Sequence, residues 1–374
     1  TIAICPVIPK PGEEQASVNQ ALRNRVLTLY PIMYRLWGGI IFRKLLPWQD
    51  AWWKKEMRGG TPGGRTEQVN WHIAIDLEEA MLDNLEKYVL ALDYTKFYDS
   101  IPWELTWKLL EEAGLPKQLV DMIKGFNQNL QRAFRIGKHM GPMWKATNGF
   151  GQGDALSVMV GNFIVAIWAH TIEMQHPEVD ITAFIDDRTM RSGNLQKLVE
   201  AAETTVEIDQ VLGQATNVSK SAIMGSNDKA KRKVKKVKIK GQAVPYAASV
   251  KSLGTMITTK KGGDTTCAVK REKQAIQAAR RCMTVPGRGH KYAAAIIVPK
   301  LNFGGYLVSP GKSRMKRVQP ALNKMVFGKY RKYRAEELVY VLLEKGHRLH
   351  AESAHHYNVV TQGTDILRKD EQLQ

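Results

Sequence analysis

Short runs of apolar residues alternate with longer amphipathic segments along the chain. The short runs predict buried strands, and segments with apolar residues three or four positions apart predict helices with one buried face. A hairpin is predicted around Gly137 and Gly141. The alternation is compatible with an α+β fold but does not specify one. The predicted strands cover residues 7–12, 24–29, 89–93, 181–185 and 250–254, and the predicted helices cover residues 32–46, 67–88, 116–130 and 195–212.

Two glycine-rich segments and a polar C-terminal stretch interrupt this pattern. Residues 59–66 predict a mobile turn. A phosphate-cradling loop is the alternative there, but the Lys-Ser/Thr ending of a nucleotide-binding P-loop is missing. Residues 149–157 contain three glycines, which allow a backbone to approach a ligand closely. Residues 350–374 are polar and are predicted to be frayed.

Two of the predicted strands end in aspartates. Residues 181–185 lead directly into Asp186 and Asp187, and residues 89–92 lead into Asp93. Successive side chains of a strand point to opposite faces, so the adjacent acids predict a hairpin tip at which both approach one cleft. Mg²⁺ prefers oxygen ligands, so the pair indicates a site for a divalent cation. An Asp-Asp turn after a buried strand is the alternative.

Lys10 and Arg25 lie on the two N-terminal strands, which we expect to pair. Neighbouring ammonium and guanidinium groups on one sheet could bind phosphate, because Arg supplies a planar fork and Lys a point charge. Two ordinary surface cations are the alternative, and these residues alone favour it.

The chain has 374 residues and a net charge of +19, from 55 Lys and Arg against 36 Asp and Glu. This excess indicates a polyanionic partner, with nucleic acid as the first candidate. A ribosomal or membrane-surface protein also fits the charge alone. Nine Lys or Arg and no acid lie between Lys229 and Lys251. This basic run predicts a lysine-protected edge strand, a nuclear-import-like signal or a track for backbone phosphates.

Three cysteines, Cys5, Cys267 and Cys282, have no metal-ligand spacing and predict a reducing compartment. No signal peptide is apparent, and the apolar run 155–169 is too short to span a membrane. We therefore expect a soluble intracellular protein with no membrane partner, and a nuclear location is compatible with the basic run. The chain opens on Thr1 and not on Met, so we expect a fragment. The oligomeric state stays open.

In chain order, these segments resemble the motifs of reverse transcriptases, specifically those of non-LTR retrotransposons. Two N-terminal segments, residues 8–12 and 24–29, resemble the fingers motifs. The resemblance covers roughly residues 5–310, and the order of five motifs carries it. Those five, which resemble the palm motifs and the primer grip, are LDYTKFYDSI at 92–101, GFGQGDALS at 149–157, FIDD at 184–187, NVSKS at 217–221 and VKSLG at 250–254.

The resemblance implies an α+β right-hand polymerase fold of fingers, palm and thumb, in which helices back an antiparallel palm sheet. On this basis residues 1–90 form the fingers. Residues 91–258 form the palm, with a fingers insertion near residues 116–148. Residues 259–374 form the thumb and a basic helical region. The implied function is synthesis of DNA from deoxynucleoside triphosphates on an RNA template with a DNA primer, in retrotransposition.

The resemblance also implies the catalytic residues. Asp93, Asp186 and Asp187 would be the metal ligands for two Mg²⁺ ions, with Mn²⁺ as a substitute. Lys220 would act as a general acid that protonates the pyrophosphate leaving group.

The residues implied to bind the deoxynucleoside triphosphate come from four segments. Lys10 and Arg25 would bind the triphosphate. Tyr98 would stack near the sugar and exclude a 2′-hydroxyl. Gln152 and Gly153 would line the nucleotide pocket and the template strand.

Gly151 and Phe97 depart from the family pattern, which often has Pro or Arg at the first position and a small residue at the second. Neither is an implied metal ligand, so we expect activity. One alternative is a catalytically inactive nucleic-acid-binding relic of a retroelement. Another is an RNA-templated RNA polymerase, against which the bulk of Tyr98 argues. No endonuclease domain and no acidic cluster of an RNase H are apparent.

Overall fold

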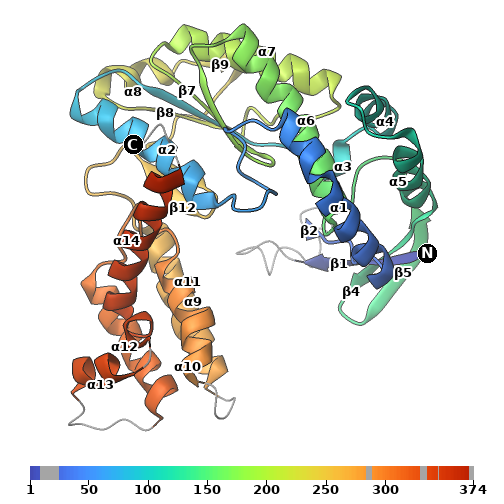
Figure 1. Ribbon diagram of the computed structural model, residues 1–374. Helices are drawn as coiled ribbons and strands as arrows, with labels where there is room; N and C mark the ends of the chain where they lie inside the picture. Colours follow the sequence, from blue (N-terminus) through green and yellow to red (C-terminus); the bar gives the residue numbers. More distant parts are fainter. Residues whose placement is uncertain (9–24, 284–288, 329–334, 344, 370–374) are drawn as a thin grey trace. The chain divides into compact units, whose positions relative to one another are not determined.

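The computed structural model describes residues 1–8, 25–283, 289–328, 335–343 and 345–369 (Figure 1). The chain forms two compact units that are interleaved in sequence. The first unit consists of Thr1–Arg65, Tyr88–Ile223 and Arg232–Tyr246, and the second consists of Thr66–Lys87, Met224–Lys231 and Ala247–Gln374.

A four-stranded sheet forms the centre of the first unit. Its strands follow the order β6-β7-β3-β8, and β7 pairs antiparallel with both β6 and β3. Tyr88, Val89 and Leu90 are at most 1% exposed, which explains the uninterrupted apolar run in their strand. The strands predicted at 89–93 and 181–185 are thus confirmed. The four strands are β3 (Tyr88–Leu92), β6 (Asp180–Phe184), β7 (Asp187–Ser192) and β8 (Ala222–Gly225).

Two helices pack beside this sheet, α6 (Ala155–Gln175) and α7 (Leu195–Val211) (Figure 1). Trp168 of α6 donates its Nε1–H to the hydroxyl of Thr205 of α7 at 3.0 Å, and both residues are fully buried. Helix α6 is longer than the apolar run 155–169. By length and composition alone it could cross a membrane, but 72% of its most apolar window is buried inside the protein. A core helix surrounded by other elements has this composition.

A second four-stranded sheet contains the N-terminal strand. Its order is β2-β1-β4-β5, and β1 pairs antiparallel with β2 and parallel with β4. Val7 lies opposite Val26, so the predicted pairing of the N-terminal strands is confirmed over the described residues. Tyr34 of α1 stacks on Phe126 of α5, with 3.5 Å between the ring centroids. These elements are β1 (Ile2–Ile8), β2 (Arg25–Val26), β4 (Gln131–Ile136), β5 (His139–Lys145), α1 (Ile32–Trp52) and α5 (Lys117–Asn129).

The remaining elements of the first unit are short. Helix α8 (Asp228–Val234) begins in the second unit and ends in the first. The others are α3 (Phe97–Ser100), α4 (Trp103–Glu112), β9 (Lys238–Ile239) and β10 (Gln242–Ala243).

The second unit begins with α2 (Thr66–Leu82). The sequence pattern predicts that this helix continues to residue 88, which is wrong. The chain leaves the helix after Leu82, adopts a left-handed conformation at Asn84 with φ of 52°, and enters β3 at Tyr88. Asn tolerates this conformation better than most residues, so it ends the helix where a glycine would be expected.

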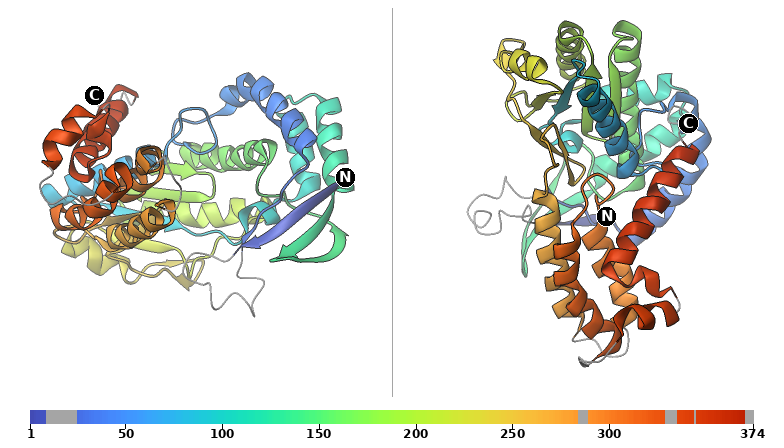
Figure 2. Two further views of the ribbon diagram at one scale, coloured as in Figure 1. Left: turned by 90° about the horizontal axis from the view of Figure 1, so that it is seen from below. Right: turned by 90° about the vertical axis from the view of Figure 1, so that its left-hand side faces the viewer.

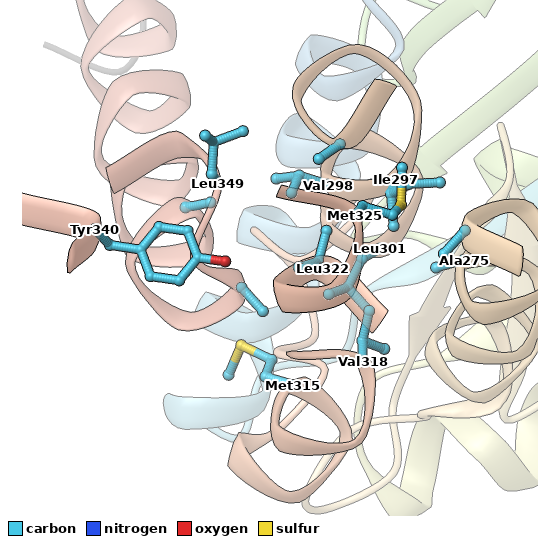
Figure 3. Close-up of a cluster of buried hydrophobic side chains, with 14 residues drawn as sticks. Ala275, Ile297, Val298, Leu301, Met315, Val318, Leu322, Met325, Tyr340 and Leu349 are labelled. Carbon is cyan, nitrogen blue, oxygen red and sulfur yellow. The ribbon is translucent and has the colours of Figure 1, made fainter. Parts of the chain in front are cut away.

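Helices form most of the second unit, and α9, α11, α12 and α14 pack side by side (Figure 2). Ala275, Ile297, Leu301, Val318 and Leu322 are at most 1% exposed in their common core (Figure 3). The elements are α9 (Thr266–Cys282), α10 (Gly289–Tyr292), a π-helix (Ala293–Ile297), α11 (Val298–Asn302), α12 (Lys312–Phe327), α13 (Glu336–Leu342), a 3₁₀ helix (Gly346–Arg348) and α14 (Ala351–Lys369).

The prediction of a frayed C-terminal stretch is wrong for the residues up to Lys369. They form α14, which packs against α11 and α12. Ala351, Ala354 and Ile366 are at most 4% exposed. This face has few large apolar residues, so the surrounding polar residues hide it in the sequence.

Candidate active site

The turn between β6 and β7 carries Asp186 and Asp187. Phe184 pairs with Asp187, which leaves Ile185 and Asp186 as a two-residue loop. Ile185 has a φ of 59°, which fits the first loop position of a type II′ turn but is strained for a β-branched residue. Both aspartates are exposed. The predicted hairpin tip is therefore confirmed.

The segment before α2 supports this turn. The Arg58 N–H donates to the carbonyl of Ala183 at 2.9 Å, so the segment pairs with the edge strand β6. A Cβ at Gly59 would lie 2.8 Å from Cγ1 of Ile185, and Asn162 of α6 donates to the Gly59 carbonyl at 2.8 Å. The first residues of the segment 59–66 are thus packed against the acidic turn, and the prediction of a mobile turn is wrong for them.

Asp93 follows the last residue of β3, beside this turn. Leu92 lies opposite Arg188 in the antiparallel register, so the next pair along the strands is Asp93 and Asp187. Residues directly opposite have Cβ atoms about 4.5–5.5 Å apart, and like charges there repel each other. Asp93 is exposed. Three carboxylates therefore lie at neighbouring strand ends, where a cation would relieve their repulsion.

No three His, Cys, Asp or Glu side chains converge into a ready-made metal site within the described ranges. The backbone brings Asp93, Asp186 and Asp187 to one edge of the sheet, but their side chains do not close around a common point. A bound cation would have to draw them together.

The segment 215–221 is fastened to the backbone of Asp93. The Asn217 N–H donates to the Asp93 carbonyl at 2.7 Å, and the Asp93 N–H donates to the Ser221 hydroxyl at 3.1 Å. The Asn217 side chain accepts the backbone N–H of Lys220 at 3.2 Å, which closes a tight turn. The Lys220 side chain is exposed. These bonds hold Lys220 in the neighbourhood of Asp93.

The residues that follow the acids form a buried network. Arg188 Nη1 lies 2.9 Å from Asp209 Oδ1 of α7 and 2.8 Å from the Tyr94 hydroxyl. Tyr94 donates to Asp209 Oδ2 at 2.9 Å, and burial raises the pKa of Tyr94, so it remains a neutral donor. Because side chains alternate along a strand, burying Arg188 and Tyr94 turns Asp187 and Asp93 to the opposite side.

Tyr98 lies in α3 close to Asp186. Burial raises the pKa of Tyr98, and the negative charge of Asp186 raises it further. The hydroxyl is therefore protonated at neutral pH. The Tyr98 carbonyl accepts the N–H of Phe150 at 2.8 Å. Tyr98 thus adjoins both the acidic turn and the glycine-rich segment 149–157.

The glycine-rich segment packs against the N-terminal strands. The Thr28 N–H donates to the carbonyl of Gln152 at 2.8 Å. A Cβ at Gly151 would lie 2.5 Å from the Tyr30 hydroxyl and 2.6 Å from Oγ1 of Thr28. This crowding explains why Gly151 departs from the family pattern. Gln152 is half-buried and Gly153 is exposed.

Lys10 and the side chain of Arg25 lie outside the described residues. The backbone of Arg25 is in β2, opposite Ile8.

A hairpin in the second unit contains the segment 250–254. Its strands β11 (Ser249–Ser252) and β12 (Thr255–Thr258) are joined by Leu253 and Gly254. Both loop residues have positive φ, 46° and 84°, as a type I′ turn requires.

Two residues that the sequence analysis did not assign hold this hairpin. Asn70 of α2 is fully buried, donates to Thr255 Oγ1 at 3.0 Å and accepts from Ser252 Oγ at 2.8 Å. Arg271 of α9 donates to the carbonyl at the hairpin tip, Gly254. Neither gave a signal in the sequence, because one is a polar residue in an amphipathic helix and the other is one arginine among many.

Comparison with known proteins adds three findings. A family model described as reverse transcriptase (RNA-dependent DNA polymerase) matches residues 8–257. A search of curated proteins found no match. Solved structures of telomerase are similar to this chain in fold.

Apo telomerase from Candida tropicalis superposes with a TM-score of 0.52 at 11% identity, over 100% of this chain and 68% of that chain. Telomerase from Candida albicans in complex with a TWJ fragment of telomeric RNA superposes with a TM-score of 0.51 at 11% identity. This match covers 99% of this chain and 63% of that chain. The corresponding complex from Candida tropicalis superposes with a TM-score of 0.50 at 12% identity, over 100% of this chain and 63% of that chain. This chain therefore spans less than two thirds of the length of both telomerases solved with RNA, and identities this low establish the fold alone.

The matched region contains Asp93, the β6–β7 turn and all but the last residue of the hairpin formed by β11 and β12. An antiparallel sheet backed by helices, with acids at its strand ends, is the α+β right-hand polymerase architecture that the motifs imply. The chain belongs to the reverse transcriptase (RNA-dependent DNA polymerase) family.

Proposed function

We propose that the chain synthesises DNA from deoxynucleoside triphosphates on an RNA template, from a DNA primer. The observation that carries the proposal is the outward placement of Asp93 and Asp187 at paired strand ends, with Asp186 in the adjoining turn. Membership of the reverse transcriptase family supports a nucleic-acid-templated polymerase. Telomerase structures solved with RNA support an RNA partner. Because the motifs resemble those of non-LTR retrotransposons, we also propose that this synthesis serves retrotransposition.

The three carboxylates fit two Mg²⁺ ions, with Mn²⁺ as a substitute, because they supply exposed oxygen donors whose mutual repulsion a cation relieves. Asp93 and Asp186 would be the main ligands of these ions, and Asp187 would be the weaker one. When bound, the ions would stabilise the attacking and leaving oxygens of phosphoryl transfer. Arg188 and Tyr94, fixed by Asp209, would keep the strand ends in place while the carboxylates move together.

Four other residues would handle the nucleotide next to these acids. Tyr98 lies near Asp186, whose negative charge raises the pKa of its hydroxyl, and its ring would block a 2′-hydroxyl. Gln152 and Gly153 would line the base and template side. Lys220, held near Asp93, would protonate the pyrophosphate leaving group.

Lys10 and Arg25 would bind the triphosphate. The division into fingers (1–90), palm (91–258, with an insertion near 116–148) and thumb (259–374) is part of the same proposal. So is the use of the hairpin around Gly254 to hold the primer end.

Nucleic-acid binding without catalysis is the second candidate function. It is favoured by the open arrangement of the acids, which do not form a ready-made metal site within the described ranges. RNA synthesis on an RNA template is less well supported, because the bulk of Tyr98 would reject ribonucleotides.

Primer extension on a ribonucleotide template with a DNA primer, Mg²⁺ and deoxynucleotides tests the proposal. Asp186→Asn is expected to reduce the rate at least about a hundredfold, because it replaces a charged ligand of the proposed ions with a neutral one. Asp50→Asn, at an exposed acid elsewhere in the first unit, is the matched control and should match the wild type. Tyr98→Ala should gain ribonucleotide incorporation. If the wild type binds template and primer but never extends, the binding candidate replaces the polymerase.

A further inference from the structure

The proposed reaction leaves one strongly basic part of the first unit without a role. Residues 232–246 contain six basic side chains and no acidic one. We call these residues the basic segment. Its six basic residues are Arg232, Lys233, Lys235, Lys236, Lys238 and Lys240.

Apolar side chains anchor the basic segment to the unit. Val234, Val237, Ile239 and Val244 are 0–7% exposed, and β9 pairs with β10 in a small hairpin. Burial of these side chains removes apolar surface from water and stabilises the folded segment. An import signal that a receptor reads as an extended peptide would lose this burial. The anchoring therefore favours a partner that binds the segment as a folded surface.

The basic segment lies beside α7, and Figure 1 shows β9 next to that helix. The Lys240 N–H donates to Glu203 of α7 at 3.1 Å, and its ammonium pairs with Glu207 one turn further along. Asp209 on the same helix is buried and holds Arg188 of the central sheet. The segment also reaches the central sheet, because the Ile223 N–H of the edge strand β8 donates to the Pro245 carbonyl at 3.0 Å. The basic segment therefore lies against α7 and the outer edge of β8, and not at the strand ends that carry Asp93 and Asp187.

Three charges of the basic segment have no compensating partner. Lys235, Lys236 and Lys238 are exposed, and none forms an ion pair with any residue in the described ranges. Lys235 contacts the Tyr246 ring at 5.5 Å from its centroid. Three positive charges within four residues of an anchored surface repel one another, so an anion bound across them would be favoured.

We propose that the basic segment is a second nucleic-acid site, which binds the phosphodiester backbone away from the acidic strand ends. Lysine ammonium groups act as point charges on phosphates, and contacts to phosphates carry no sequence information. The recognition is therefore independent of sequence. RNA is the expected occupant, which rests on the proposed function, because the RNA template must extend beyond the site of synthesis. DNA has the same backbone phosphates and is the alternative that the test distinguishes.

The test is the salt dependence of binding to an oligonucleotide of about 15 nucleotides. The variant Lys235→Gln/Lys236→Gln/Lys238→Gln is compared with Lys44→Gln/Lys55→Gln/Lys108→Gln, which removes the same charge from exposed positions outside the segment. For single strands, log K falls with log salt, and each lost phosphate contact makes this negative slope shallower by about 0.7. The slope for the segment variant should be shallower by about 2, and this variant should bind one oligonucleotide fewer per chain. The control should show neither change.

The inference is overturned if both variants lose equal slope, or if the segment variant still binds as many oligonucleotides as the wild type. It is also overturned if anionic vesicles, and not RNA or DNA, show the variant-dependent binding. Parallel arms with RNA and DNA of one sequence identify the occupant. Repeating the series in Asp186→Asn separates this site from the proposed polymerase, because loss of extension there leaves the slope difference intact.

Discussion

Arg188 and Asp209 face each other in the interior, with side chains 0% and 1% exposed. Removing one partner of such a pair leaves an uncompensated buried charge and costs about 3–5 kcal/mol. Asp209→Ala is therefore expected to lower the free energy of unfolding by that amount in urea titrations. The double variant Arg188→Met/Asp209→Leu should cost clearly less, because no charge stays buried. Equal costs for the two proteins would contradict the role of the pair.

Asp154 is expected to give the first unit a pH-dependent stability. It caps α6, where its carboxylate accepts the Ser157 N–H at 3.2 Å and the Tyr34 hydroxyl at 3.3 Å. Burial outweighs these bonds and raises the pKa of Asp154 above its ordinary value of 3.8. Between 3.8 and the raised pKa the folded state binds more protons than the unfolded state. Stability therefore falls as the pH rises through this window.

Asp154→Asn removes the titrating group and keeps an oxygen acceptor for the cap. Its free energy of unfolding should lack the downward step that we expect for the wild type as the pH rises from 3.8 through the raised pKa of Asp154. Urea titrations of both proteins across this range measure the difference. Parallel pH profiles would rule out Asp154 as the source.

At the residue scale, the sequence predicts the acids better than their supports. Asp93 and the Asp186–Asp187 pair follow apolar runs, so the pattern predicts that they lie at strand ends, and the motif resemblance implies that they share one site. Asp209 and Asn70 are polar residues in helices, and their partners are distant in sequence. Asn70 bonds to a residue 185 positions away, and periodicity contains no information about such a contact.

At the scale of elements, the hairpin of β11 and β12 depends on Asn70. Asn70→Ala removes the hydrogen bonds that the Asn70 side chain makes to the hydroxyls of Ser252 and the buried Thr255, at a cost of about 1–3 kcal/mol. Amide hydrogen exchange over residues 249–258 should accelerate accordingly. Asn129→Ala removes an exposed side-chain hydrogen bond and is the matched control. Unchanged exchange in the hairpin would show that Arg271 alone holds it.

Elements with a clear period are predicted from sequence, and their ends and supports are not. The pattern predicts α5 at 116–130, and the helix covers Lys117–Asn129. It does not find the end of α2, which a left-handed Asn84 sets, or α14, whose packing face has few large apolar residues. The sequence also does not predict that Gly59 packs against the acidic turn, because glycines indicate a break in regular structure whether or not the loop is packed.

At the scale of the whole molecule, each unit has its own core. Leu322 is fully buried in the second unit and Ile164 in the first. Leu322→Ala should cost the second unit about 2–5 kcal/mol, as should Ile164→Ala for the first. Hydrogen exchange followed by mass spectrometry should show faster exchange of α9 and α12 in the first variant, and of β3 and β7 in the second. Equal acceleration everywhere would mean that the units unfold as one.

The interleaving of the two units has a consequence for synthesis on the ribosome. Asn70 emerges 182 residues before Ser252, to which it bonds. At about 5–20 residues per second, α2 waits about 10–40 s for its partners. During that time α2, whose Val69, Ile73 and Leu77 are buried in the finished protein, lacks the contacts that β12 supplies. The nascent chain thus exposes an apolar helix early and depends on chaperones, or on a slow start to folding, until the last third of the protein has been made.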